Sequence, residues 1–110
     1  MTVNELIQKT GFEVISLADG ERKIEGCYVG DLLSWVMGRA SADNAWVTIM
    51  TNQNIIAVAT LIDLSCIIIA ENSEIDTVVV DLAKEKGVNI LKTADNAFSV
   101  CRTLSALILE

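Results

Sequence analysis

The chain has 110 residues and a formal net charge of −7 at pH 7. This length fits one compact domain over residues 1–110, too small for a catalytic domain beside a regulatory one. The negative charge repels phosphate backbones and anionic headgroups, so we expect neither nucleic acid nor a membrane as partner.

The first third of the chain predicts one helix, two strands and the start of a second helix. Thr2 and Glu5 form a potential capping box, and Gly11 is a natural stop for the helix between them. Strands are expected at residues 12–17 and 24–29. Asp31 then precedes an apolar segment that ends near Gly38, which predicts that Asp31 is the N-cap of a helix.

The middle of the chain predicts a buried strand, a helix and another buried strand. Residues 45–50 and 66–70 are apolar runs of strand length, typical of strands covered on both faces. Residues 53–64 are apolar around most of a helical circumference, which predicts burial on every side, by the sheet and by a partner chain.

The last third predicts two helices around a short strand. Ser73 and Asp76 form a possible capping pair for a helix that ends at Gly87, with its apolar positions at Ile75, Val78, Val79 and Leu82. A strand follows at residues 88–91, and Thr93 starts a last helix. The apolar face of that helix consists of Ala97, Val100, Cys101, Leu104 and Ile108.

Alternating helices and strands predict an α/β fold: a three-layer domain with a mostly parallel sheet and helices on both faces. If the later strands are parallel, their carboxyl ends share one edge, where open α/β sheets bind ligands. Polar residues suited to a sugar or phosphate follow those strands and the expected helix start. These candidate ligand-binding residues are Gly30, Asp31, Thr51, Asn52, Asn54, Glu71 and Thr93. Turn and cap roles are the alternative interpretation of each.

The chain contains few of the residue types and motifs that enzymes commonly use for catalysis. Histidine is absent, which removes the usual general base near neutral pH, and no phosphate-binding loop motif occurs. The chain has three cysteines, Cys27, Cys66 and Cys101, and none of them forms a C-x-x-C motif. This spacing argues against a metal or disulfide framework, and we expect the three side chains to be small buried hydrophobic groups. We therefore expect a protein that is not an enzyme and that carries no cofactor and no metal.

The residue content also bears on partners and compartment. Hydrophobic residues make up 52% of the chain, more than a small monomer easily hides, which predicts a homodimer. The opening residues do not resemble a secretory signal, so a cytoplasmic location is expected.

Residues 21–38 and 46–59 resemble the DRTGG domain family, and the resemblance extends over essentially the whole chain. Glu21, Arg22 and Gly26 match parts of the motif that names the family, whereas residues 23–25 depart from it. The family resembles the amino-terminal domain of HPr kinase/phosphorylase and also occurs in CBS-domain pyrophosphatases and phosphotransacetylases. The resemblance implies a regulatory or interface module with dimer contacts and adenine-nucleotide regulation. Free-standing relatives imply an accessory role beside electron-transfer and iron-only hydrogenase components.

Three hypotheses follow. The first is a homodimeric regulatory module that binds a small ligand such as a nucleotide at the strand-end cluster. The second is an assembly protein that recruits a redox partner through an apolar helix surface, without a ligand. The third is an enzyme that uses carboxylates alone, such as Asp31 and Glu71, and the sequence gives it the least support.

Overall fold

The computed structural model describes residues 1–108 and begins with a short helix, α1 (Val3–Thr10). The expected capping box is confirmed. The Thr2 hydroxyl accepts a hydrogen bond from the Glu5 N–H at 3.1 Å, and the Glu5 carboxylate accepts one from the Thr2 N–H at 3.2 Å. Gly11 ends the helix with a φ of 72°, a left-handed conformation that costs glycine little.

Five strands form one sheet, which confirms the mostly parallel arrangement. They are β1 (Glu13–Ser16), β2 (Gly26–Val29), β3 (Asn44–Thr48), β4 (Cys66–Ile69) and β5 (Ile90–Lys92). Their order across the sheet is β1-β5-β4-β3-β2, and only β1 runs antiparallel to its neighbour. Consecutive strands from β2 to β5 are therefore adjacent, and each is joined to the next by a helix.

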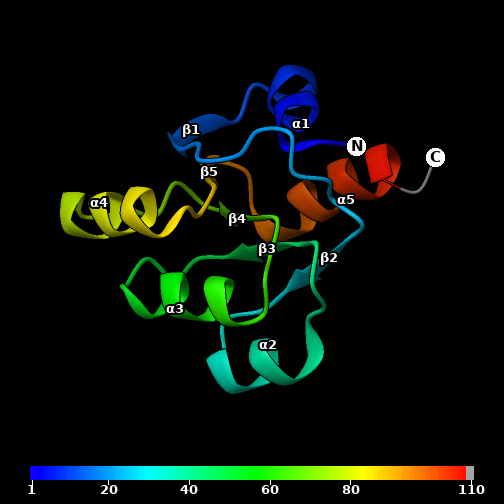
Figure 1. The fold of residues 1–110 in the computed structure, drawn as a ribbon. Helices are drawn as coiled ribbons and strands as arrows, with labels where there is room; N and C mark the ends of the chain where they lie inside the picture. Colours follow the sequence, from blue (N-terminus) through cyan, green and yellow to red (C-terminus); the bar gives the residue numbers. More distant parts are fainter. Residues whose placement is uncertain (109–110) are drawn as a thin grey trace.

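The helices cover both faces of the sheet, as the predicted three-layer α/β class requires (Figure 1). On one face α2 (Leu33–Arg39), α3 (Asn54–Leu61) and α4 (Thr77–Lys86) pack on side chains such as Trp46, Ile67 and Ile69. On the other face α1 and α5 (Ala97–Ile108) pack on Val47, Ile68 and Leu91. Alternate residues of β4 thus enter opposite cores, which explains its unbroken apolar sequence.

Helix α3 is shorter than predicted, and within the single chain it is covered on one side only. It ends at Leu61, and Asp63 takes a φ of 59° in the turn that leads to β4. Ile55 and Ile56 are buried against the sheet, but Leu61 is 73% exposed. The sheet and neighbouring helices thus cover only part of the circumference of α3, and burial of the remainder by a partner chain stays a prediction.

Two expected helix starts are also wrong. Helix α4 begins at Thr77 after Asp76, whose side chain makes no capping hydrogen bond, so the Ser73–Asp76 pair does not form a capping box. Its inward face is Val79 and Ala83, whereas Val78 is 70% exposed. Helix α5 begins at Ala97 rather than near Thr93. Asn96 supplies its cap, because the Asn96 amide oxygen accepts a hydrogen bond from the Ser99 N–H.

Candidate functional site

The carboxyl ends of β4 and β5 lie side by side, and the chain leaves them toward opposite layers. The loop after β4 leads to α4 on one face, and the loop after β5 leads to α5 on the other. Ligands commonly bind between such diverging loops. Here backbone hydrogen bonds join the loops, from the Glu71 N–H to the Asp95 carbonyl and from the Asn72 N–H to the Thr93 carbonyl, both 2.8 Å. These amides are therefore already paired.

Asp31 does not cap a helix, contrary to the prediction. Helix α2 begins after Leu32, and the Asp31 carboxylate turns to the end of β3. Its Oδ1 atom accepts hydrogen bonds from the Thr48 hydroxyl at 2.7 Å and from the Ile49 N–H at 3.0 Å. Donors from β3 thus satisfy the carboxylate in place of the first turn of α2. The neighbouring Gly30 carbonyl accepts a hydrogen bond from the indole N–H of buried Trp46 at 2.9 Å.

The polar segment after β3 builds the start of α3. The Asn52 amide oxygen accepts a hydrogen bond from the Asn54 N–H at 2.9 Å, an arrangement typical of an Asx turn. Thr51 is partly buried, whereas Asn52 and Asn54 are exposed. Asn52 therefore has the local structural role that the alternative interpretation gave it.

The candidate residues share the carboxyl edge of the sheet, but they fall into separate groups there. Asn54 lines a groove between α3 and α4. Thr93 lines a different hollow, beside the end of α1, together with Asn72 and Lys92. Gly30 and Asp31 form a third group, tied to β3 by the contacts above.

The groove between α3 and α4 has a volume of about 480 Å³. Its lining combines apolar side chains with two amides, one hydroxyl and one ammonium group. The lining residues are Gln53, Asn54, Ile56, Ala57, Thr60, Leu61, Leu82 and Lys86. The apolar part can hold a flat ring, the amides can both donate and accept hydrogen bonds, and Lys86 can pair with an anion.

Sequence reasoning missed Lys86. The available signal was its spacing, because Lys86 follows Leu82 by four residues, which places both side chains on one face of α4. Assigning that face to a groove also required knowing that α3 lies beside α4.

Arg22, a residue matching the family motif, lies at the opposite edge of the sheet. Its guanidinium donates hydrogen bonds to Asp43 Oδ1 at 2.8 and 3.1 Å, to Asp63 Oδ1 at 3.1 Å and to the Asp63 carbonyl at 2.7 Å. Both aspartates have positive φ values, in the turns that precede β3 and β4. Burial alone would lower the pKa of Arg22, but the hydrogen bonds and charges of the aspartates outweigh it and raise the pKa. Arg22 thus joins the two turns that precede β3 and β4 through its hydrogen bonds.

The cysteines differ in environment. Cys66 is 1% exposed, as expected of a small buried hydrophobe, but Cys27 is exposed and Cys101 is partly buried. The prediction of burial is therefore wrong for Cys27, because β2 is an edge strand. Within residues 1–108, no group of acidic or cysteine side chains is arranged to hold a metal ion, and no helix is long and apolar enough to cross a bilayer.

Comparison with known proteins places the fold and the family. None of the curated proteins compared with the chain matches it. The chain is similar to the crystal structure of the CBS and DRTGG domains of the regulatory region of Clostridium perfringens pyrophosphatase, complexed with the activator diadenosine tetraphosphate. The TM-score is 0.71 and the sequence identity 13%, over 92% of this chain and 44% of that chain. This chain thus spans less than half the length of that solved chain. The model of the DRTGG domain matches residues 5–107, and the chain belongs to the DRTGG domain family.

Proposed function

We propose that this protein is a cytoplasmic, non-enzymatic regulatory module that binds a small ligand such as a nucleotide. One observation carries the proposal: the α3–α4 groove joins an apolar wall to separated polar groups, and one of the predicted site residues, Asn54, lines it. Its volume of about 480 Å³ falls within the range of roughly 300–1,000 Å³ that is typical of small-molecule sites.

The lining suits the parts of a nucleotide. Ala57, Leu61 and Leu82 offer apolar surface to the faces of a base. The side-chain amide of Asn54 can donate and accept hydrogen bonds at the base edge, and the Lys86 ammonium can pair with a phosphate. These groups bind and orient a ligand, and they supply no matched acid and base for its chemical conversion.

The solved relative supports a nucleotide as the first class to test. That regulatory region was crystallised with diadenosine tetraphosphate as its activator. At 13% identity the likeness extends to the fold, so the ligand of this chain is part of the proposal.

The test is calorimetric titration of the chain with AMP, ATP and diadenosine tetraphosphate. Lys86→Gln and Asn54→Ala should each weaken binding by about tenfold, the effect of losing one hydrogen bond of about 1.4 kcal/mol. Lys84→Gln is the matched control: it removes the same charge from an exposed position on α4 outside the residues that line the groove, and should bind as the wild type does.

The variant Thr93→Ala distinguishes binding in the α3–α4 groove from binding in the hollow beside α1. If Thr93→Ala abolishes binding while Asn54→Ala and Lys86→Gln leave it unchanged, the ligand occupies the hollow beside α1 and the groove assignment is wrong. Absence of binding by the wild-type chain to all three probes would contradict a nucleotide ligand.

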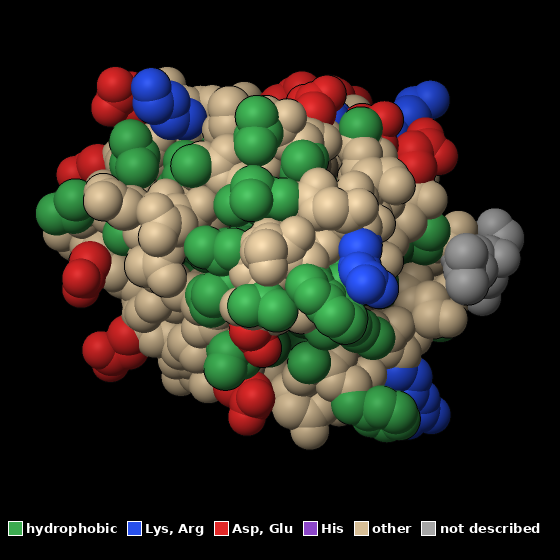
Figure 2. Space-filling view, turned by 90° about the horizontal axis from the view of Figure 1, so that it is seen from below, with side chains coloured by type: hydrophobic (Ala, Val, Ile, Leu, Met, Phe, Trp, Pro, Cys, Tyr) green, Lys and Arg blue, Asp and Glu red, His purple; other side chains and the backbone are tan. Residues whose placement is uncertain are grey.

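A second candidate function is assembly through an apolar surface. Hydrophobic side chains gather over the face formed by α2 and α3, with charged groups mainly around its margin (Figure 2). Leu32 is 59% exposed and Trp35 is 52% exposed on the α2 side of this face. Such exposure is typical of a surface that meets another protein, and we propose a second copy of the chain first and a redox protein of the iron-only hydrogenase type second.

Native mass spectrometry tests the assembly proposal. The wild-type chain should be a dimer, and Trp35→Glu should dissociate it because the substitution replaces the exposed apolar indole with a charged group that loses its water on association. Val78→Glu, which places the same charge on an exposed apolar residue of α4, should leave the dimer intact. A wild-type monomer would contradict the homodimer.

A further inference from the structure

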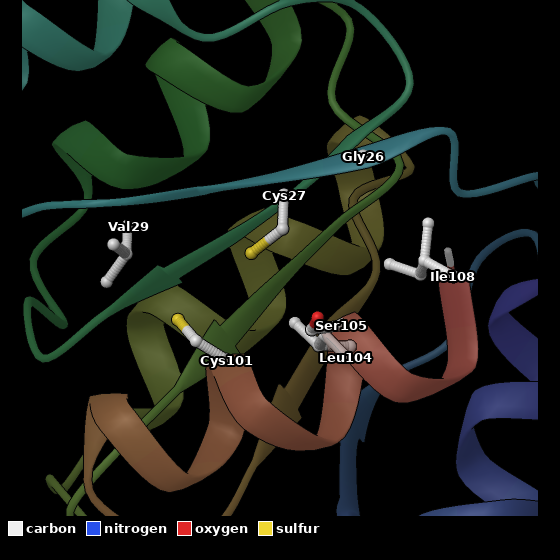
Figure 3. A pocket seen from close by; sticks show the side chains of 7 residues that line it. All are labelled: Gly26, Cys27, Val29, Cys101, Leu104, Ser105 and Ile108. Atoms are coloured by element: carbon white, nitrogen blue, oxygen red, sulfur yellow. The ribbon is translucent and has the colours of Figure 1, made fainter. Parts of the chain in front are cut away.

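Cys27 and Cys101 face each other across the gap between the edge strand β2 and the last helix α5. Figure 3 shows both side chains lining the same hollow, with the Cys27 sulfur directed from β2 toward α5 and the Cys101 sulfur directed from α5 toward β2. The hollow has a volume of about 310 Å³ and also contains Val29, Leu104 and Ile108. The two thiols are close enough to influence each other, because Cys101 contributes to the raised pKa of Cys27.

The third cysteine does not belong to this pair. Cys27 and Cys66 flank Ala45 in register, on the two strands that neighbour β3. Since adjacent strands are about 4.8 Å apart, the two Cα atoms are separated by roughly 9.6 Å, beyond the limit of about 7 Å for a disulfide. Only Cys27 and Cys101 meet within the hollow described above.

The surroundings favour a neutral product of the two thiols. Although part of the Cys27 side chain reaches the surface, the apolar groups around it desolvate the thiol, and this desolvation, followed by the influence of Cys101, raises the pKa of Cys27 to about 12. The apolar lining therefore penalises a thiolate, whereas a disulfide carries no charge and is not penalised. Because the Cys27 thiol is not stabilised as a thiolate, the reduced state gains no thiolate stabilisation that would oppose disulfide formation.

We propose that Cys27 and Cys101 form a reversible disulfide that fastens α5 to β2, making this corner of the domain a redox modification site. The oxidant is a low-molecular-weight disulfide. One cysteine, after losing its proton, attacks a sulfur of the small disulfide, whose S–S bond breaks to release one small thiol. The second cysteine then loses its proton and attacks the mixed disulfide, releasing the second small thiol. Two cysteines are oxidised and one small disulfide is reduced.

The test is a redox titration of the full chain in buffers of glutathione and glutathione disulfide. Samples are quenched in acid, alkylated with iodoacetamide in denaturant and weighed intact. The folded chain should lose two alkylatable thiols and the mass of two hydrogen atoms, and peptide mapping should link Cys27 to Cys101. Cys66 should remain alkylatable.

A parallel titration in urea shows whether the fold creates the pair. For a closed loop of about 75 residues, the folded chain should form the bond with an equilibrium constant roughly a thousandfold larger than the unfolded chain. Cys66→Ala should keep this bond, and Cys101→Ser should stop at a glutathione adduct on Cys27. Equal oxidation of folded and unfolded chains, a linked dimer, or a glutathione adduct that persists on wild-type Cys27 would each overturn the proposal. If a variant fails to fold, the titration of the wild-type chain alone still shows whether the Cys27–Cys101 disulfide forms.

Discussion

Replacing Arg22 with methionine should destabilise the fold without weakening ligand binding. The substitution removes four hydrogen bonds to Asp43 and Asp63, and it leaves two carboxylates beside each other without a cation. Methionine keeps much of the apolar stem of the arginine side chain.

The expected loss of unfolding free energy depends on how far the two aspartates are exposed to solvent. Bonds to charged groups contribute about 1.5–3 kcal/mol each when well shielded. The Asp43 and Asp63 side chains are 45% and 72% exposed, so each ion pair is discounted to at most about 1 kcal/mol. With the bond to the Asp63 carbonyl, the expected loss is about 2 kcal/mol of unfolding free energy.

Urea unfolding at neutral pH, followed by circular dichroism, measures this loss for Arg22→Met. Lys23→Met is the matched control, because it removes the same charge from the neighbouring exposed residue and should change the unfolding free energy by less than about 0.5 kcal/mol. The reasoning about Arg22 is refuted if Arg22→Met is as stable as the wild type, or if both variants lose the same stability.

Three further predictions concern other parts of the fold. Burial raises the pKa of the Cys66 thiol from its ordinary 9.0 to about 12, so its stabilising contribution is complete below pH 9 and is lost as the pH rises toward 12. Between about pH 8 and about pH 10.5, urea unfolding of Cys66→Ala should therefore lose about 2 kcal/mol less than the wild type, and parallel pH profiles would contradict this. Asp31→Ala should lower the unfolding free energy by about 2 kcal/mol because the Thr48 hydroxyl and the next-residue amide lose their acceptor, and Asp31→Asn should recover part of the loss in the same assay. Gly87→Ala should lower the midpoint of thermal unfolding, at about 1 kcal/mol for a φ of 72°, whereas Gly38→Ala inside α2 should raise it, and equal signs would refute the conformational argument.

The sequence predicts best the features that neighbouring residues decide. The Thr2–Glu5 capping box and the helix stops at Gly11 and Gly87 involve donors and conformations within a few positions, and the structure has all three. The alternation of helices with apolar strands also predicts the three-layer sheet, because only that arrangement buries strands such as β4 on both faces.

Long-range partners explain most of what sequence reasoning missed. Asp31 has a helix start beside it in sequence, yet donors at the end of β3 bind its carboxylate. Cys27 and Cys101 are far apart in the chain and contain no spacing motif, so only the packing of α5 on β2 brings them together. The groove that contains Asn54 and Lys86 likewise depends on which helices are neighbours.

The most direct test of ligand binding in the α3–α4 groove is a nuclear magnetic resonance titration of the isotopically labelled chain with diadenosine tetraphosphate. Backbone amide signals of Asn54, Thr60 and Leu82 should shift with ligand concentration along one binding curve, while those of Arg22 and Thr93 stay in place. Shifts confined to the edge near Thr93, or no shifts at any residue, would contradict the account.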